Sequence, residues 1–311
     1  MTAPLPRVSV VIPAYNYGHY LVETIESVLQ QTYTQFELIV VDDGSTDHTR
    51  DIALDFGERI RYLHQENAGL SAARNTGIMN AVGVFIALLD ADDQWLPNTL
   101  EKIMEKFDKL SPEFAMVATA TRRIDIQGEA LPTKRTAYQH DKELCVHDFI
   151  LKNRPLSSSV VLKRQAFDAC GFFDTTLHSS EDRDMWIRIA TRFRIFYLSE
   201  PLVLLRRHPS NMSKHADRMK QNTRRVLLKA YRNGAAPRSC FTLWLRAFSI
   251  YFFQISWTHF DAGRSFDALR YIVTSFLLWP FCLSSARFEE PAFFRLRALA
   301  RFLGGKIARA G

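Results

Sequence analysis

The chain has 311 residues, 47% of them hydrophobic, which is enough for one large domain and a smaller one. Its four cysteines lie far apart with no CxxC pair, so neither a zinc site nor a disulfide framework is expected, and a reducing cytosol is favoured. The net charge of +7 is uneven: residues 201–311 hold 19 Lys and Arg against 5 Asp and Glu, whereas residues 1–200 hold 21 against 28. A basic end on an acidic body predicts an anionic partner for that end.

Strands and helices alternate through the first part of the chain. This spacing predicts a mainly parallel sheet with helices on both faces. Right-handed crossovers place the carboxyl ends of such strands on one rim, so the loops that follow them should converge. Strands are predicted at 8–12, 36–41, 60–63, 84–89, 115–120, 158–162, 195–198 and 201–205, and helices at 18–31, 71–80, 97–110 and 182–190.

Three carboxylates, Asp90, Asp92 and Asp93, directly follow the apolar run 85–89. Ionised groups cannot be buried unpaired without a cost of several kcal/mol, so these side chains are expected at the sheet rim. Closely spaced carboxylates favour a divalent cation that carries substrate phosphates. The alternative is the first turn of a helix beginning at 95–97, where acids are also favoured.

Two further rim segments suit a nucleotide. Asp43 ends the second strand, where it can accept from a base N–H or a ribose hydroxyl, although residues 42–47 also suit a helix N-cap. Arg74 lies in a small-residue helix start that suits a diphosphate, or it pairs with a surface acid. Neither GxGxxG after the first strand nor GxxxxGK[ST] occurs, which argues against dehydrogenases and P-loop NTPases.

Together, VSVVIPAYNYGHYLVETIESVLQQTYTQFELIVVDDGSTD (8–47), AGLSAARN (68–75) and LLDADD (88–93) resemble the inverting glycosyltransferase family 2, through about residue 210. The resemblance implies a GT-A fold, which is Rossmann-like. It also implies a nucleotide-diphosphate sugar as donor, with UDP-linked sugars expected, and Mn²⁺ or Mg²⁺ as cofactor. The donor-binding residues that it implies are Pro13, Ala14, Tyr15, Asp43, Arg74, Asp90 and Asp92, with Asp92 the main metal ligand beside Asp90 and Asp93.

The segment EDRDMWIRIA (181–190) resembles the family's ED motif, whose aspartate is the general base. An inverting transfer needs a carboxylate that takes the proton of the acceptor hydroxyl. Asp182, next to Glu181, is the residue that matches, and Asp184 is the fallback. Without the resemblance, these acids read as ordinary helix N-terminal residues. His178 lies nearby, but a lone histidine is more often structural.

After the last strand, Arg207 and His208 are candidates for a cationic flap over the diphosphate, and equally for a basic domain boundary. The boundary is placed at 1–212 and 213–311. The second part is expected to be α-helical, over 241–260, 265–278 and 287–307, with Arg264, Asp267, Arg270 and Thr274 as a polar stripe. Helix 241–260 is expected to pack within a helical hairpin, and the basic end to dock on an anionic membrane.

These features predict a metal-dependent inverting glycosyltransferase that acts on a glycan or lipid-linked acceptor in bacterial cell-surface polysaccharide or lipopolysaccharide synthesis. No signal peptide and no apolar stretch of ~18–20 residues is seen, so a cytoplasmic protein, peripheral on the inner membrane face, is expected. Nucleic acid is not expected as a partner, because the basic residues accompany apolar faces. The alternatives are a nucleotidyltransferase, which should carry a glycine-rich loop after the first strand, and an inactive nucleotide-sugar-binding protein, which should have lost a carboxylate.

Overall fold

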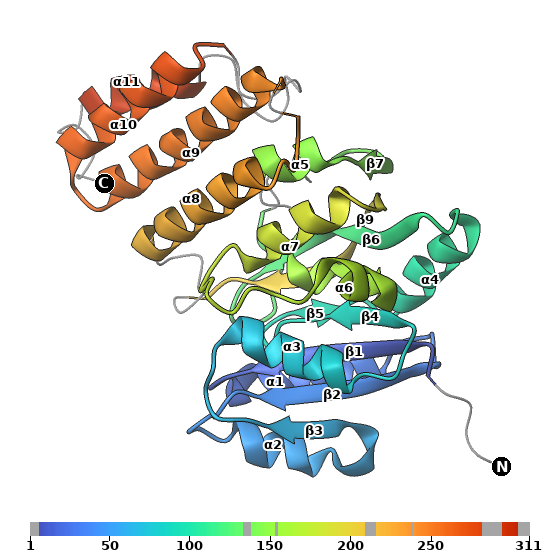
Figure 1. Ribbon diagram of the computed structural model, residues 1–311. Coiled ribbons are helices and arrows are strands. Elements are labelled where there is room, and N and C mark those ends of the chain that lie inside the picture. The colour runs from blue at the N-terminus through green and yellow to red at the C-terminus, as the bar shows by residue number, and fades with distance from the viewer. Residues whose placement is uncertain are drawn as a thin grey trace. The chain divides into compact units, whose positions relative to one another are not determined.

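The computed structural model describes residues 6–132, 138–152, 155–208, 216–237, 239–281 and 294–303. The chain forms two compact units, one of residues 1–146 and 153–211 and the other of residues 147–152 and 212–311. The elements in chain order are β1 (Val8–Ala14), α1 (Gly18–Leu29), β2 (Phe36–Asp42), α2 (Thr49–Asp55), β3 (Arg61–His64), α3 (Leu70–Asn80), β4 (Phe85–Leu88), β5 (Gln94–Trp95), α4 (Thr99–Lys109), β6 (Phe114–Ile124), β7 (Lys142–Leu144), α5 (Val146–Leu151), β8 (Val160–Lys163), α6 (Arg164–Cys170), α7 (Glu181–Ala190), β9 (Arg194–Arg206), α8 (Ala216–Arg232), α9 (Phe241–Asp261), α10 (Ser265–Leu278) and α11 (Phe294–Leu303) (Figure 1).

The first unit is built on one sheet, which has nine strands within the described residues. Its order is β3-β2-β1-β4-β8-β6-β9-β5, with β7 paired to β9. The strands β1 to β4 are parallel, as their alternation with helices predicts. The second half is mixed, because β8 runs antiparallel to both β4 and β6 while β6 and β9 run parallel.

Helices cover both faces of the parallel half, as predicted. All seven residues of β1 are buried. Val10 and Ile12 lie in one core cluster with Leu21 and Ile25 of α1. Val11, on the opposite face, lies under α3, where it approaches Gly77. Burial on both faces explains why this strand is apolar apart from Ser9 instead of alternating between apolar and polar residues.

The prediction that a helix begins at 95–97 is wrong about where the helix starts. Gln94 and Trp95 form the short strand β5, antiparallel to β9, and α4 begins only at Thr99. The Trp95 indole N–H also donates to the Ser158 carbonyl at 2.8 Å. A two-residue strand carries no periodicity, so its partner across the sheet decides its conformation.

The two strands predicted at 195–198 and 201–205 are one strand, β9. Its pairing with β6 shifts register on either side of the Ala120–Pro201 pair. Proline has no N–H to donate, so a strand passes through it at such an irregularity. The apolar pattern in the sequence is interrupted at Pro201, whereas the strand continues through it.

The second unit is α-helical, as predicted. The helices α9 and α10 form a hairpin whose turn contains Gly263 in the left-handed region at φ 76°. Phe253 of α9 packs with Ile272 of α10 and Phe302 of α11. Residues 287–293 and 304–307 of the third predicted helix lie outside the described residues. Among the helices described, none combines the length and apolar character that a membrane crossing requires.

Replacing Gly77 tests the close approach of α3 to the sheet. A Cβ at this position would lie 2.3 Å from Val11 Cγ1. We expect Gly77→Ala to lower the free energy of unfolding by about 1–3 kcal/mol through overpacking, although alanine is the better helix former. Urea unfolding measures the change. Met79→Ala, at an exposed position of the same helix, is the control and should be nearly neutral. A Gly77→Ala protein as stable as wild type would contradict the packing.

Candidate functional site

The loops after β1 and β2 are joined at the rim of the parallel strands. Asn16 is in the left-handed region at φ 57°. Its backbone N–H donates to Ser45 Oγ at 2.9 Å, and its Oδ1 accepts from Thr46 N at 2.8 Å. These reciprocal bonds place both loops at one edge of the sheet, as expected from the parallel crossovers.

Asp43 is buried directly after β2 and holds the loop that leads into α3. Its Oδ1 accepts from Gln65 Nε2 at 2.7 Å and from Ala68 N at 2.9 Å, and its Oδ2 accepts from Gly69 N at 2.8 Å. A carboxylate offers about four acceptor sites. Asp43 therefore keeps capacity for one further donor while it fixes the start of α3.

The other residues predicted for a base pocket lie beside Asp43. Pro13 and Ala14 are buried at the end of β1, and the Ala14 carbonyl accepts from Asp43 N at 2.8 Å. Tyr15 follows them and is exposed, so its ring is accessible to a ligand. An accessible aromatic ring next to a rim carboxylate can stack on a flat base.

Arg74 brings two of the predicted motifs together. Its guanidinium is buried, and Nη2 donates to Asp90 Oδ1 at 2.6 Å while Nη1 donates to Glu181 Oε1 at 2.7 Å. It also lies over the Phe173 ring, 5.5 Å from the centroid. Burial alone lowers the pKa of Arg74, but Asp90 and Glu181 outweigh burial and hold it above the ordinary value. Arg74 thus remains charged and links α3, the acidic loop and α7.

Asp182 differs from its acidic neighbours. It is 7% exposed, and its Oδ1 accepts from Arg183 N at 2.7 Å. Burial, reinforced by the negative charge of Glu181, raises the pKa of Asp182 to about 7, against the opposing effect of Arg74. Asp184 is paired with Arg188 at 2.9 Å on the same helix. A pKa near 7 suits a proton acceptor at neutral pH, and Asp182 is therefore the candidate base.

His178, which precedes this helix, is exposed. The buried residues next to it, Leu177 and Ser179, anchor the segment. The Leu177 carbonyl accepts from Ser71 Oγ at 3.3 Å. We assign His178 no part in the site.

The three acids of the 90–93 loop have three different environments. Asp90 pairs with Arg74 and is partly exposed. Asp92 is buried, with Oδ2 at 2.8 Å from His208 Nε2. Asp93 accepts from Ser158 Oγ at 2.5 Å and from Arg206 N at 3.0 Å. Burial and the charges of Asp92 and Asp90 raise the pKa of Asp93 well above its ordinary value.

Of the two residues predicted for a flap, His208 lies against the acidic loop. It is buried, and Tyr17 and Tyr20 flank its ring at centroid distances of 5.8 Å and 5.3 Å. Burial, followed by the charge of Asp92, raises the pKa of Tyr17 above its ordinary value. Arg207 is half-buried, and its backbone N–H donates to the Ile124 carbonyl at 2.9 Å.

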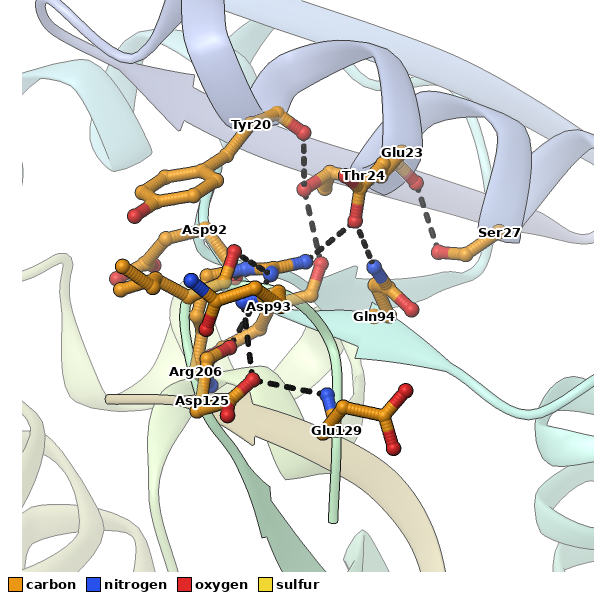
Figure 2. Close-up of polar contacts among 12 residues, drawn as sticks. Tyr20, Glu23, Thr24, Ser27, Asp92, Asp93, Gln94, Asp125, Glu129 and Arg206 are labelled. Atoms are coloured by element: carbon orange, nitrogen blue, oxygen red, sulfur yellow. Dashed lines mark hydrogen bonds and ion pairs between the residues drawn. The ribbon is translucent and has the colours of Figure 1, made fainter. Parts of the chain in front are cut away.

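Sequence reasoning overlooked Arg206, the arginine that supports the acidic loop. Figure 2 shows it between the loop, α1 and the segment after β6. Nη2 pairs with Glu23 Oε2 at 2.5 Å, Nε donates to the Asp92 carbonyl at 3.2 Å, and the guanidinium lies 4.6 Å from the Tyr20 ring centroid. The period of two in a strand was the available signal, because it places residues 206 and 208 on one face and 207 on the other.

A divalent cation fits part of this arrangement. Asp92 offers a carboxylate oxygen, the donor type that suits Mn²⁺ or Mg²⁺, and the His208 imidazole nitrogen already faces it. Asp93 fits less well, because both of its oxygens accept internal hydrogen bonds. Within the described ranges, no three His, Cys, Asp or Glu side chains form a complete cluster for a metal. One or two protein ligands, completed by substrate phosphates, are the usual arrangement for Mg²⁺.

The support given by Arg206 can be tested by removing its charge. Arg206→Met should remove one donor from Glu23 and from several backbone carbonyls, and lower the free energy of unfolding by about 2–4 kcal/mol. Chemical denaturation measures the loss. Arg61→Met, which removes an exposed arginine bonded to Asn80, should cost less than about 1 kcal/mol. Equal losses in both variants would show that Arg206 gives no special support.

Comparison with known proteins identifies the family. The family model described as Glycosyl transferase family 2 matches residues 9–170. An uncharacterized glycosyltransferase of Rickettsia prowazekii is 33% identical over 213 residues, which are 68% of this chain and 67% of that protein. For a relative from Rickettsia felis, 32% identical over 217 residues, the match spans 35% of its length. TuaG of Bacillus subtilis, provisionally named a teichuronic acid biosynthesis glycosyltransferase, is 36% identical over 166 residues, which are 52% of this chain and 64% of TuaG.

Two solved structures share the fold. Staphylococcus aureus TarS 1-349 in complex with UDP-GlcNAc matches 97% of this chain and 93% of its own, with a TM-score of 0.59 at 16% identity. The mannosyltransferase PcManGT from Pyrobaculum calidifontis, in complex with GDP-Man and Mn²⁺, matches 98% and 89%, with a TM-score of 0.59 at 19% identity. The chain therefore has the GT-A fold and belongs to glycosyltransferase family 2.

Proposed function

We propose that this glycosyltransferase moves a sugar from a nucleotide-diphosphate donor to an acceptor hydroxyl with inversion at the anomeric carbon. The acceptor oxygen forms a bond to that carbon, and the bond from the carbon to the diphosphate oxygen breaks. The electron pair of the broken bond leaves with the nucleoside diphosphate, and the hydroxyl proton passes to a carboxylate base. A preorganised base and a positioned acceptor are what such a step requires.

The observation that carries the proposal is the buried Asp182, whose pKa is raised to about 7. Its neighbour Glu181 is tied through Arg74 to Asp90 of the acidic loop. The proposed base and the proposed diphosphate site are therefore fixed to one guanidinium. We assign Asp182 as the general base and Glu181 as the residue that anchors it.

For the donor, we propose that Asp43 and Tyr15 bind the nucleobase, with Pro13 and Ala14 forming the wall behind them. The accessible Tyr15 ring and the remaining acceptor capacity of Asp43 support this assignment. UDP is the nucleotide that we favour, since TarS 1-349 is known in complex with both UDP and UDP-GlcNAc. PcManGT in complex with GDP-Man marks the alternative within the same fold.

We propose that Asp92 and His208, with Asp90, hold the diphosphate end of the donor together with Mn²⁺ or Mg²⁺. The 2.8 Å separation of Asp92 Oδ2 and His208 Nε2 supports this assignment. Asp93 fixes the loop on its buried side, where it accepts a hydrogen bond from Ser158 Oγ. A bound cation would offset negative charge on the departing diphosphate. Arg207 stays a candidate contact for the same phosphates.

For the acceptor, we propose a glycan or lipid-linked glycan of the bacterial cell surface, glycosylated on the cytoplasmic side of the membrane. The name of TuaG, which places it in teichuronic acid biosynthesis, supports the polysaccharide class. The basic composition of residues 201–311 supports work near an anionic surface.

Replacing the base separates catalysis from folding. Asp182→Asn should lower kcat by about 10²–10⁴-fold while donor affinity stays near that of wild type, because the lost group acts on the acceptor proton. In the wild type, kcat/KM should fall below about pH 7 as Asp182 becomes protonated. Steady-state transfer assays and calorimetric donor titration measure both effects.

The same pKa shift gives a control on folding. Since the pKa of Asp182 in the folded chain is above the ordinary value of 3.8, ionisation destabilises the folded state as the pH rises from about 4 to about 7. Asp182→Asn should therefore melt no lower than wild type at pH 7. Asp184→Asn is the matched variant and should retain transfer. Loss of transfer in Asp184→Asn alone would move the base to that residue.

Replacing the proposed metal ligand tests the donor site. Asp92→Ala should weaken Mn²⁺-dependent donor binding by at least about tenfold, because it removes one of few protein ligands. Titration of UDP-sugars and GDP-sugars with and without Mn²⁺ measures the change and identifies the nucleotide. Asp108→Asn, an exposed acid paired with Arg7, is the control. Donor affinity that is unchanged in Asp92→Ala would refute the assignment.

A further inference from the structure

We propose that α10 and α11 form a docking surface for an anionic lipid bilayer, on which their exposed apolar side chains rest between arginines. The inference depends on the second unit alone and does not require the proposed reaction. The proposed partner is a membrane surface, and the outward helical face that would contact it is apolar where a surface helix in water is ordinarily polar.

The outward face of α10 is apolar. Phe266 and Leu277 are 82% and 81% exposed, and Val273 between them is also exposed. Spacings of seven and four residues place all three on one side of the helix. The opposite, buried side carries Ala268, Ile272 and Ser275. Beyond the helix end, Phe281 continues the exposed apolar series.

The helix α4 of the same chain shows the ordinary arrangement. It buries Ile103 and Phe107 and exposes the charged Glu101, Glu105 and Asp108. A surface helix in water normally has this amphipathic order. The helix α10 therefore departs from the pattern that the chain itself follows elsewhere.

Polar groups are correspondingly placed inside the second unit. Ser249 and Ser275 are fully buried, and the Ser249 hydroxyl donates to the Ser275 carbonyl at 2.7 Å. The buried guanidinium of Arg295 donates to Ser249 Oγ at 3.2 Å and to the Trp279 carbonyl at 2.7 Å. Helices that contact lipid typically have small polar residues hydrogen-bonded to one another on the inside and apolar side chains on the outside.

The helix α11 repeats the combination of apolar and basic side chains. Leu296 and Leu303 are exposed, and Arg297 and Arg301 lie beside them. Arg270 is exposed among the apolar residues of α10. Apolar side chains enter the boundary between headgroups and acyl chains, while arginines meet the lipid phosphates.

Charge selects the bilayer over a second copy of the chain as the occupant. Residues 212–311 hold 17 Lys and Arg against 5 Asp and Glu. Two such surfaces would repel each other, whereas a leaflet of anionic lipid attracts them.

Cosedimentation of the full chain with vesicles tests the proposal. Wild type should pellet with vesicles of phosphatidylcholine and phosphatidylglycerol, and much less with pure phosphatidylcholine. Phe266→Ser/Leu277→Ser should weaken partitioning by at least about tenfold, because two apolar anchors are lost. Arg270→Gln/Arg297→Gln should weaken binding by about tenfold or more, and only on the anionic vesicles.

Leu54→Ser/Met79→Ser is the matched control, because it also replaces two exposed apolar residues on helices, here α2 and α3. It should pellet as wild type does. Transfer to a small water-soluble acceptor should persist in all three double variants, which separates failure of docking from failure of the proposed reaction. The docking proposal is overturned if Phe266→Ser/Leu277→Ser pellets like wild type. It is overturned equally if sedimentation velocity shows a wild-type dimer that this variant abolishes.

Discussion

One buried guanidinium holds the site of this glycosyltransferase together. Arg74 is 1% exposed and bonded to carboxylates from two other segments, Asp90 after β4 and Glu181 at the start of α7. A charge at this depth is tolerated only when it is paired and hydrogen-bonded. The three segments therefore adopt their positions together, and a shift of α3 would leave charges unpaired on both sides. The close contact of Gly77 with Val11 fixes that helix on the sheet.

Unequal environments then give similar acids different properties. Asp90 faces a permanent positive charge, Asp92 faces an imidazole, and Asp93 faces a hydroxyl and a backbone N–H. Asp182, next to Glu181, retains a proton up to about neutral pH because burial disfavours its charge. The proposed transfer needs one carboxylate that accepts the proton of the acceptor hydroxyl. It also needs carboxylates that stay ionised and pair with positive charge near the anionic leaving group.

Most of the parallel half of the sheet is readable from sequence because β1, β2 and β4 are largely buried and appear as mainly apolar runs. The acidic loop is readable for a related reason, since carboxylates after such a run must lie at the rim. The strand β5 is not readable, because Gln94 and Trp95 are extended only through their pairing with Val203 and Leu204. Arg206 was overlooked for a similar reason, because its inward direction depends on β9 continuing through Pro201.

The chemical roles of the site residues are harder to predict from sequence than their positions. The resemblance to the family selects Asp182, but the sequence contains no sign of the burial that raises its pKa. Similarly, the motif DADD shows three acids of one kind, whereas Ser158 and Arg206, distant in sequence, distinguish Asp93 from Asp92. Long-range contacts decide these properties, and local patterns do not record them.

The second unit shows that a polar stripe does not by itself decide which side chains of a helix face outward. In the polar stripe predicted for α10, Arg264 and Arg270 are exposed, whereas Asp267 and Thr274 are half-buried. Asp267 lies 3.6 Å from the buried His259, and the Thr274 hydroxyl donates to the Arg270 carbonyl at 2.9 Å. Because these polar groups find partners within the unit, Phe266 and Leu277 are the side chains left outward. An exposed apolar face gains free energy when it is covered, and this gain is the physical basis on which we propose a bilayer as the partner of α10 and α11.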